Sequence, residues 1–278
     1  EASGREAVVL SAPGQSISFT TRSATNTIDV RFSIPDGTTS SLGVYNGSTQ
    51  VGTVALTSAY SWLYGDETAP QNSGSGPRHI YDEANTVLST TVAAGSTLSV
   101  RNTGGGMIDV DFIQLELATP KANPDPAHLL TVSGFDQNAI QTAISTASQS
   151  SAYTGIYLPA GVYTVSSKFQ LSQKPLEIAG AGMWYTRLEP PAGQSNTDIG
   201  FNPSGAAATG SSFRDFAVFD NYNNRQDGAG QVFPLTNVSN ITIDSVWVAH
   251  SVVMVWGQNV DNSTFTNDRI DDTFADGI

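Results

Sequence analysis

Three aspartates, Asp271, Asp272 and Asp276, lie within six residues near the end of this 278-residue chain. Clustered carboxylates are suited to acid–base chemistry. Neighbouring negative charges raise the pKa of one carboxyl group and keep it protonated while another stays ionised. Asp276 precedes Gly277, and Asp-Gly is also a common turn pair. The aspartates alone therefore leave a structural role open, and the elements that position them decide between the two.

An internal repeat leads into these aspartates. Residues 237–243 (NVSNITI) align with residues 259–265 (NVDNSTF), an offset of 22 residues. An earlier copy at 212–218 precedes 242–248 by 30 residues, and the polar segment 221–230 accommodates the difference. A period in the low twenties with insertions between copies predicts a β-solenoid, whose coils bury their inner faces only by stacking on one another.

The repeat predicts which side chains stack. We expect three inward-facing pairs one coil apart, namely Val238 with Val260, Ile243 with Phe265 and Val248 with Ile270. Asparagines that recur at one position of successive coils are expected to form ladders of side-chain amides.

The same register places the neighbours of Asp276. It puts Met254 one coil below Asp276 and Trp256 below Ile278. An ionised aspartate is costly to bury, so Asp276 is expected to face outward. Strand alternation then places Met254, Trp256 and Phe274 on the same outer face. Trp256 and Phe274 are therefore candidate substrate-binding residues, although Trp256 also fits a role in packing.

His250 falls one coil below Asp272, and this stacked pair is a second candidate for substrate binding. A single histidine is more often structural than functional, so both interpretations stay open.

The rest of the chain predicts an all-β protein with one helix. Residues 1–117 alternate with period two between turn signals, which indicates a β-sandwich. Residues 118–134 contain three prolines and read as a linker. At 136–148, Asp136 is a suitable N-cap, and an apolar stripe predicts a helix that caps the first coil of a parallel β-helix over 135–278.

The composition disfavours several classes of binding partner. The net charge of −13 disfavours nucleic acid, anionic membranes and acidic polysaccharides, so a neutral substrate fits better. The chain has no cysteine, which excludes disulfides and thiolate chemistry. It contains no apolar run of the ~18–20 residues that a membrane span needs. Glu1 is interpreted as a residue within a domain of a longer, secreted protein and not as its true N-terminus.

Several motifs resemble a known family. After the predicted helix, residues 155–163 (GIYLPAGVY) and 176–182 (LEIAGAG) are similar to the entry segment of pectate-lyase-like β-helix enzymes. Narrower motifs occur in order at 60–65 (YSWLYG), 81–83 (YDE), 182–184 (GMW), 246–248 (VWV), 269–270 (RI) and 275–278 (ADGI). Together these resemble the bacterial α-1,3-glucanases and mycodextranases of glycoside hydrolase family 87, over nearly the whole chain.

The resemblance implies a right-handed β-helix and hydrolysis of α-1,3-glucosidic bonds with inversion by three aspartates. Asp276 matches the one in the family's Ala-Asp-Gly segment. The other two are adjacent and follow about one coil later. Asp271 and Asp272 precede Asp276, so they do not match that pair. We therefore expect a β-helix truncated at its C-terminal end and a chain that is inactive by itself.

Inverting glycosidases hold their two carboxyl groups ~6.5–9.5 Å apart, and stacked coils ~4.8 Å apart can provide such a spacing. The expected partner is a neutral α-glucan, and the expected location is outside a bacterial cell. We expect a monomer, unless a second chain supplies the remaining coils.

Catalysis is expected to need no cofactor, whereas a structural calcium ion is compatible with the sandwich. That domain resembles calcium-binding carbohydrate-binding modules. Asp111 is a candidate half of such a site, and the acidic strand that would complete it would precede Glu1. Trp62, Tyr64 and Tyr81 fit either a sugar platform or, as we prefer, packing.

Two alternatives to the glucanase remain. One is a pectate-lyase-like or polygalacturonase-like enzyme, although uronate lyases usually use calcium and a basic groove, and this chain has no obvious basic cluster. The other is a non-catalytic β-helix adhesin or fibre.

Overall fold

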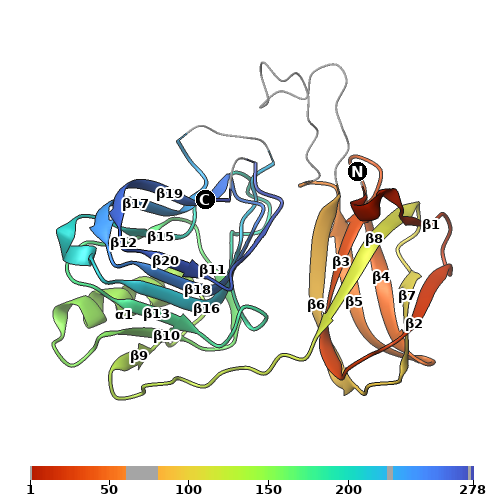
Figure 1. Ribbon diagram of the computed structural model, residues 1–278, viewed down its shortest axis with the longest axis horizontal. Coiled ribbons are helices and arrows are strands. Elements are labelled where there is room, and N and C mark those ends of the chain that lie inside the picture. Colours follow the sequence, from red (N-terminus) through yellow and green to blue (C-terminus); the bar gives the residue numbers. More distant parts are fainter. Residues whose placement is uncertain (1, 61–80, 224–227, 275–276) are drawn as a thin grey trace. The chain divides into compact units, whose positions relative to one another are not determined.

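The computed structural model describes residues 2–60, 81–223, 228–274 and 277–278. The chain divides into two compact units, Glu1–Ala118 and Thr119–Ile278 (Figure 1). Strands dominate both units, and α1 (Gln137–Gln149) is the one α-helix among the described residues, so the predicted all-β class is confirmed. No helix in the described part of the chain has the length and apolar character that crossing a bilayer requires.

The N-terminal unit contains two antiparallel four-stranded sheets, with strand orders β1-β8-β3-β6 and β2-β7-β4-β5. Alternate side chains of both sheets meet in one core, for example Ile28 and Phe32 from β3 with Leu42 and Val44 from β4. The strands are β1 (Val8–Leu10), β2 (Ser16–Thr20), β3 (Thr25–Ser33), β4 (Thr39–Asn46), β5 (Thr49–Thr57), β6 (Asp82–Val92), β7 (Thr97–Asn102) and β8 (Ile108–Glu116), preceded by the 3-10 turn Ser3–Arg5.

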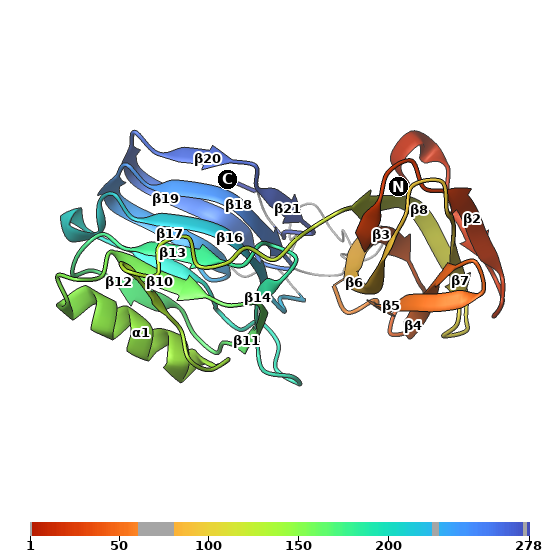
Figure 2. The ribbon, with the colours of Figure 1, turned by 90° about the horizontal axis from the view of Figure 1, so that it is seen from below.

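The C-terminal unit is a stack of parallel strands (Figure 2). We call one passage of the chain around the stack a rung. The strands are β9 (Leu129–Thr131), β10 (Gly155–Leu158), β11 (Gly161–Thr164), β12 (Phe169–Leu171), β13 (Glu177–Gly180), β14 (Thr186–Glu189), β15 (Phe201–Pro203), β16 (Ser212–Phe219), β17 (Gln231–Ser239), β18 (Thr242–Ala249), β19 (Val253–Asp261), β20 (Thr264–Thr266) and β21 (Arg269–Asp271), with a 3-10 turn at Ala206–Ala208.

The strands form three faces. Face A contains β9, β10, β13, the first halves of β16 and β18, and β20. Face B contains β11, β14, the second halves of β16 and β18, and β21. Face C contains the pairs β12–β15 and β17–β19.

The predicted register is confirmed. Val238 pairs with Val260, Ile243 with Phe265, and Val248 with Ile270. The lower member of each pair is buried, and the upper members pack against the same core. The expected amide ladder is present where Asn259 Nδ2 donates to Asn237 Oδ1 at 2.9 Å, and both residues have positive φ, which asparagine tolerates.

The predicted helix is also confirmed, with bounds shifted by one residue. The Asp136 side chain accepts a hydrogen bond from the backbone N–H of Ala139 at 2.8 Å and so satisfies one of the unpaired donors of the first turn. The buried stripe of Ile140, Ala143, Ile144 and Ala147 packs on the core at the first rung, where Figure 2 shows α1 at the edge of the stack.

Candidate active site

Asp276 lies outside the described residues. Gly277 is described, and its carbonyl oxygen accepts a hydrogen bond from the backbone N–H of Val255 at 3.2 Å. Gly277 therefore lies one rung above Val255, near the start of β19. The 22-residue register thus continues in the residues that follow β21.

Trp256 faces outward, as the alternation predicts. Its side chain is 59% exposed, whereas its neighbour Val255 is buried in the core. One rung below, Pro234 of β17 is its Cα partner. An exposed indole on a regular strand offers a flat apolar surface for a ligand.

The predicted outward placement of Met254 is wrong, and Phe274 is not open to solvent. Met254 is fully buried and belongs to the core cluster, and Phe274 is 2% exposed, so neither presents an open surface. Alternation fails here because residues 252–255 are all buried, which is the pattern of a strand covered on both faces. At Gly230, the space that a side chain would need is already filled by Val252.

His250 and Asp272 come together at the corner between faces B and C. Both have positive φ, and a ring nitrogen of His250 lies within 4.8 Å of a carboxylate oxygen of Asp272. Both side chains are half-buried. The expected stacked pair is therefore present, at the corner that precedes β19.

Asp271 points to a different environment from Asp272. It stands above Ala249 on face B and accepts a hydrogen bond from the indole N–H of Trp247. Trp247 is buried edge-on between other rings, with centroids 4.9 Å from Trp184 and 5.1 Å from Phe219. The two adjacent carboxylates therefore diverge, which argues against their acting as one catalytic pair.

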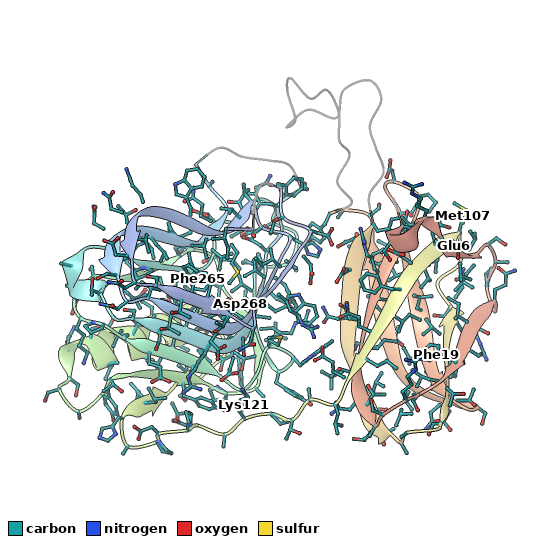
Figure 3. The ribbon with its side chains drawn as sticks, in the orientation of Figure 1. Glu6, Phe19, Met107, Lys121, Phe265 and Asp268 are labelled. Atoms are coloured by element: carbon teal, nitrogen blue, oxygen red, sulfur yellow. The ribbon has the colours of Figure 1, made fainter. Side chains whose placement is uncertain are left out.

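Two acids, one half-buried and one buried, were not singled out from the sequence. The pKa of Asp268 is raised to about 6, mainly by burial; a 2.8 Å hydrogen bond from the Val246 N–H opposes the rise, and the Asp244 carboxylate adds to it. Asp268 lies between β20 and β21, three residues after Phe265 in the chain, and both residues are labelled in Figure 3.

The second acid, Asp220, is 3% exposed and follows β16 at the corner between faces B and C. Burial raises its pKa well above the usual range, and the nearby carboxylate of Asp198 adds to the rise. One oxygen accepts from the Asn221 N–H at 2.9 Å, but Oδ2 is buried and has no hydrogen-bond partner among the residues that the structure describes. Asp198 is itself paired with Lys168. In the sequence, Asp220 looks like an ordinary loop aspartate, so only the 30-residue offset to His250 hinted at its position.

The raised pKa of Asp220 predicts a pH-dependent stability effect. The folded protein keeps the proton at pH values where the unfolded chain, with a pKa near ~3.9, has lost it, so this group lowers stability as pH rises above about 4. Asp220→Asn removes the titration and keeps the oxygen that accepts from Asn221. We expect its thermal midpoint to exceed that of the parent at pH 8 and to match it at pH 4.

Asp261→Asn, on the exposed part of β19, is the matched control and should leave the difference between the two pH values unchanged. A loss of stability at pH 8 in Asp220→Asn would mean that the ionised carboxylate is held by favourable contacts.

In the N-terminal unit, protein groups already surround Asp111. Ser3 donates to its carboxylate twice, from the backbone N–H and the hydroxyl, each at 2.8 Å. A guanidinium nitrogen of Arg31 lies 3.3 Å away, and such a charge opposes a cation at the same place. Tyr81 lies over the same arginine, with its ring centroid 5.6 Å from the guanidinium carbon. The other two candidate aromatic residues of this unit, Trp62 and Tyr64, lie outside the described residues.

Two family models match this chain, one for each of its two structural units. Residues 1–118 match the family model of the α-1,3-glucanase catalytic domain D1, and residues 131–278 match that of the α-1,3-glucanase catalytic domain D2. No curated protein sequence matches the chain.

Solved structures cover the chain more completely. A glycoside hydrolase family 87 α-1,3-glucanase catalytic domain, an aspartate-to-alanine variant with bound tetrasaccharides, is 37% identical with a TM-score of 0.91, over 100% of this chain and 51% of that one. A complex with nigerose is 35% identical with a TM-score of 0.87, over 97% and 50%. The catalytic unit of the thermostable enzyme from Streptomyces thermodiastaticus strain HF3-3 is 25% identical with a TM-score of 0.73, over 98% and 53%.

This chain thus spans about half the length of the structures it matches. Both of its units match catalytic-domain models, and the identity extends over its full length. The chain belongs to the α-1,3-glucanase catalytic-domain family, glycoside hydrolase family 87.

Proposed function

We propose that this chain forms part of a glycoside hydrolase that cleaves α-1,3-glucosidic bonds of an α-glucan with inversion, using aspartates on adjacent rungs. The observation that carries the proposal is the full-length similarity to catalytic domains solved with nigerose and with tetrasaccharides. This similarity favours a glucanase over the two alternatives, an enzyme acting on uronates and an adhesin.

Asp276 is our candidate for the first catalytic carboxylate. The solved relatives include alanine variants at three aspartates, two of them adjacent and about one rung after the third. In this chain Asp276 lies in the Ala-Asp-Gly segment, and no adjacent aspartate pair follows it. One carboxyl group would protonate the leaving oxygen, while a carboxylate on the other side of the bond would activate a water molecule.

The proposed architecture is a β-sandwich followed by rungs of a right-handed parallel β-helix. The shared core of the two antiparallel sheets supports the first element. The parallel ladders in a constant register support the second. We further propose that the enzyme is secreted by a bacterium and needs no cofactor for catalysis.

The stereochemistry of cleavage tests the proposal. The purified enzyme that contains this chain is mixed with α-1,3-linked glucose oligosaccharides, and the anomeric protons of the product are followed by NMR. We expect the β-anomer first, followed by slow mutarotation. First appearance of the α-anomer would establish retention, and an absence of cleavage would reject the hydrolase.

A further inference from the structure

Trp256 belongs to a column of outward side chains that crosses the rungs of face C. Gln170 pairs with Asn202, and Pro234 pairs with Trp256. The bridge between Ser204 and Thr236, each two residues further along, puts Asn202 and Pro234 at the same position of their rungs. We call Gln170, Asn202, Pro234 and Trp256 the face C strip.

Gln170 and Trp256 are exposed and Asn202 and Pro234 are half-buried, while most of their strand neighbours are buried. Phe169, Leu171, Phe201, Pro203, Phe233, Leu235 and Val255 are all buried. Trp256 is 59% exposed, whereas Trp184 and Trp247 are 7% and 1% exposed. Gly257 follows Trp256 and adds no side chain beside the indole.

Pro234 lies on an edge strand, where proline is tolerated in a sheet. Proline has no N–H to donate, so within sheets it is normally confined to edges and bulges. Here it lies on β17, between β15 and β19, and the ladder is interrupted at this point: β12–β15 and β17–β19 are separate two-stranded sheets, linked only by the Ser204–Thr236 bridge among the described residues. The proline ring extends the apolar surface of the indole by one rung.

The other half of the strip carries uncharged hydrogen-bonding groups. Asn202 Nδ2 donates to Gln170 Oε1 at 2.8 Å, which orients both amides. An asparagine and a glutamine joined in this way still present a carbonyl acceptor on Asn202 and an NH₂ donor on Gln170. No member of the strip is ionisable. A flat apolar surface next to neutral donors and acceptors suits a neutral sugar.

We propose that the face C strip binds a chain of α-1,3-linked glucose along the axis of the stack. Ile278 follows Asp276 by two residues, and Trp256 lies one rung below Ile278. Trp256 therefore contacts the sugar nearest the reacting bond. Asn202 and Gln170 contact a sugar further away. The strip covers three rung steps of ~4.8 Å, long enough for more than one ring. This inference rests on the proposed function.

The test measures binding with the enzyme carrying Asp276→Asn, so that ligands stay intact during calorimetry. We expect Trp256→Ala to weaken nigerose and an α-1,3-linked tetrasaccharide alike, each about tenfold, and Trp256→Phe to restore most of the affinity. Asn202→Ala and Gln170→Ala should weaken only the tetrasaccharide, by about three- to tenfold. Phe135→Ala, at a 53% exposed ring outside the strip, is the matched control and should change neither.

The outcomes separate the two proposals. A parent that binds neither sugar defeats the proposed function, and the strip with it. A parent that binds both sugars, with Trp256→Ala binding equally well but unfolding more easily, makes Trp256 a packing residue and overturns the strip alone. Unchanged tetrasaccharide affinity in Asn202→Ala and Gln170→Ala overturns the direction proposed for the glucan.

Discussion

Asp276→Asn in the complete enzyme is expected to lower kcat by at least about 10²–10⁴-fold, with little change in KM or in thermal stability. General acid or base catalysis by one positioned group contributes about this much. Asparagine keeps the size of the side chain but can neither gain nor lose a proton at working pH. Initial rates on α-1,3-linked oligosaccharides, together with a thermal melt, measure the effect.

Asp271→Asn provides the informative comparison, because the Asp271 carboxylate is engaged by the indole N–H of Trp247. We expect it to retain much more activity than Asp276→Asn. If instead Asp276→Asn retains its activity and the Asp271→Asn and Asp272→Asn variants lose theirs, Asp271 and Asp272 are the catalytic carboxylates. The assignment of Asp276 is then wrong.

The repeat explains why so much of the C-terminal unit could be predicted. Stacked rungs bury the same positions again and again, so the 22-residue offset alone identified pairs such as Ile243 with Phe265 and the ladder of Asn237 with Asn259. The helix was equally accessible, because the Asp136 cap and the apolar stripe are both local signals. These features depend on short-range chemistry that a single sequence records.

The errors arose where burial depends on segments far apart in the chain. Met254 was expected on an open face, but both faces of this part of β19 are covered, which no alternation pattern reveals. Asp220 has the composition of a loop aspartate, and only the fold encloses it beside Asp198 and raises its pKa. The divergence of Asp271 from Asp272 likewise depends on Trp247, a residue of the rung below.

The largest stability effect is expected at Phe201, whose ring is fully buried at the centre of the aromatic core of the C-terminal unit. Its centroid lies 5.3 Å from that of Phe169, 5.5 Å from those of Phe213 and Phe216, and 6.3 Å from that of Phe233. Phe169, Phe201 and Phe233 come from three successive rungs of face C. The Phe201 ring therefore packs against the rung below and the rung above it, in a stack where each rung contacts only its neighbours.

Phe201→Ala should reduce the free energy of unfolding by about 3–5 kcal/mol, because the strands on either side cannot close the cavity that the ring leaves. Phe201→Leu fills part of that volume and should lose less. Equilibrium denaturation by urea measures both variants, and Val162→Ala, at a 51% exposed side chain, serves as the control. Since rungs are stabilised by stacking, the alanine variant should also unfold over a broader range of urea as the first rungs separate from the later ones. A loss below about 1 kcal/mol with an unchanged slope would mean that the neighbouring phenylalanines collapse into the space, and that the rungs are joined by their backbone ladders instead of this ring.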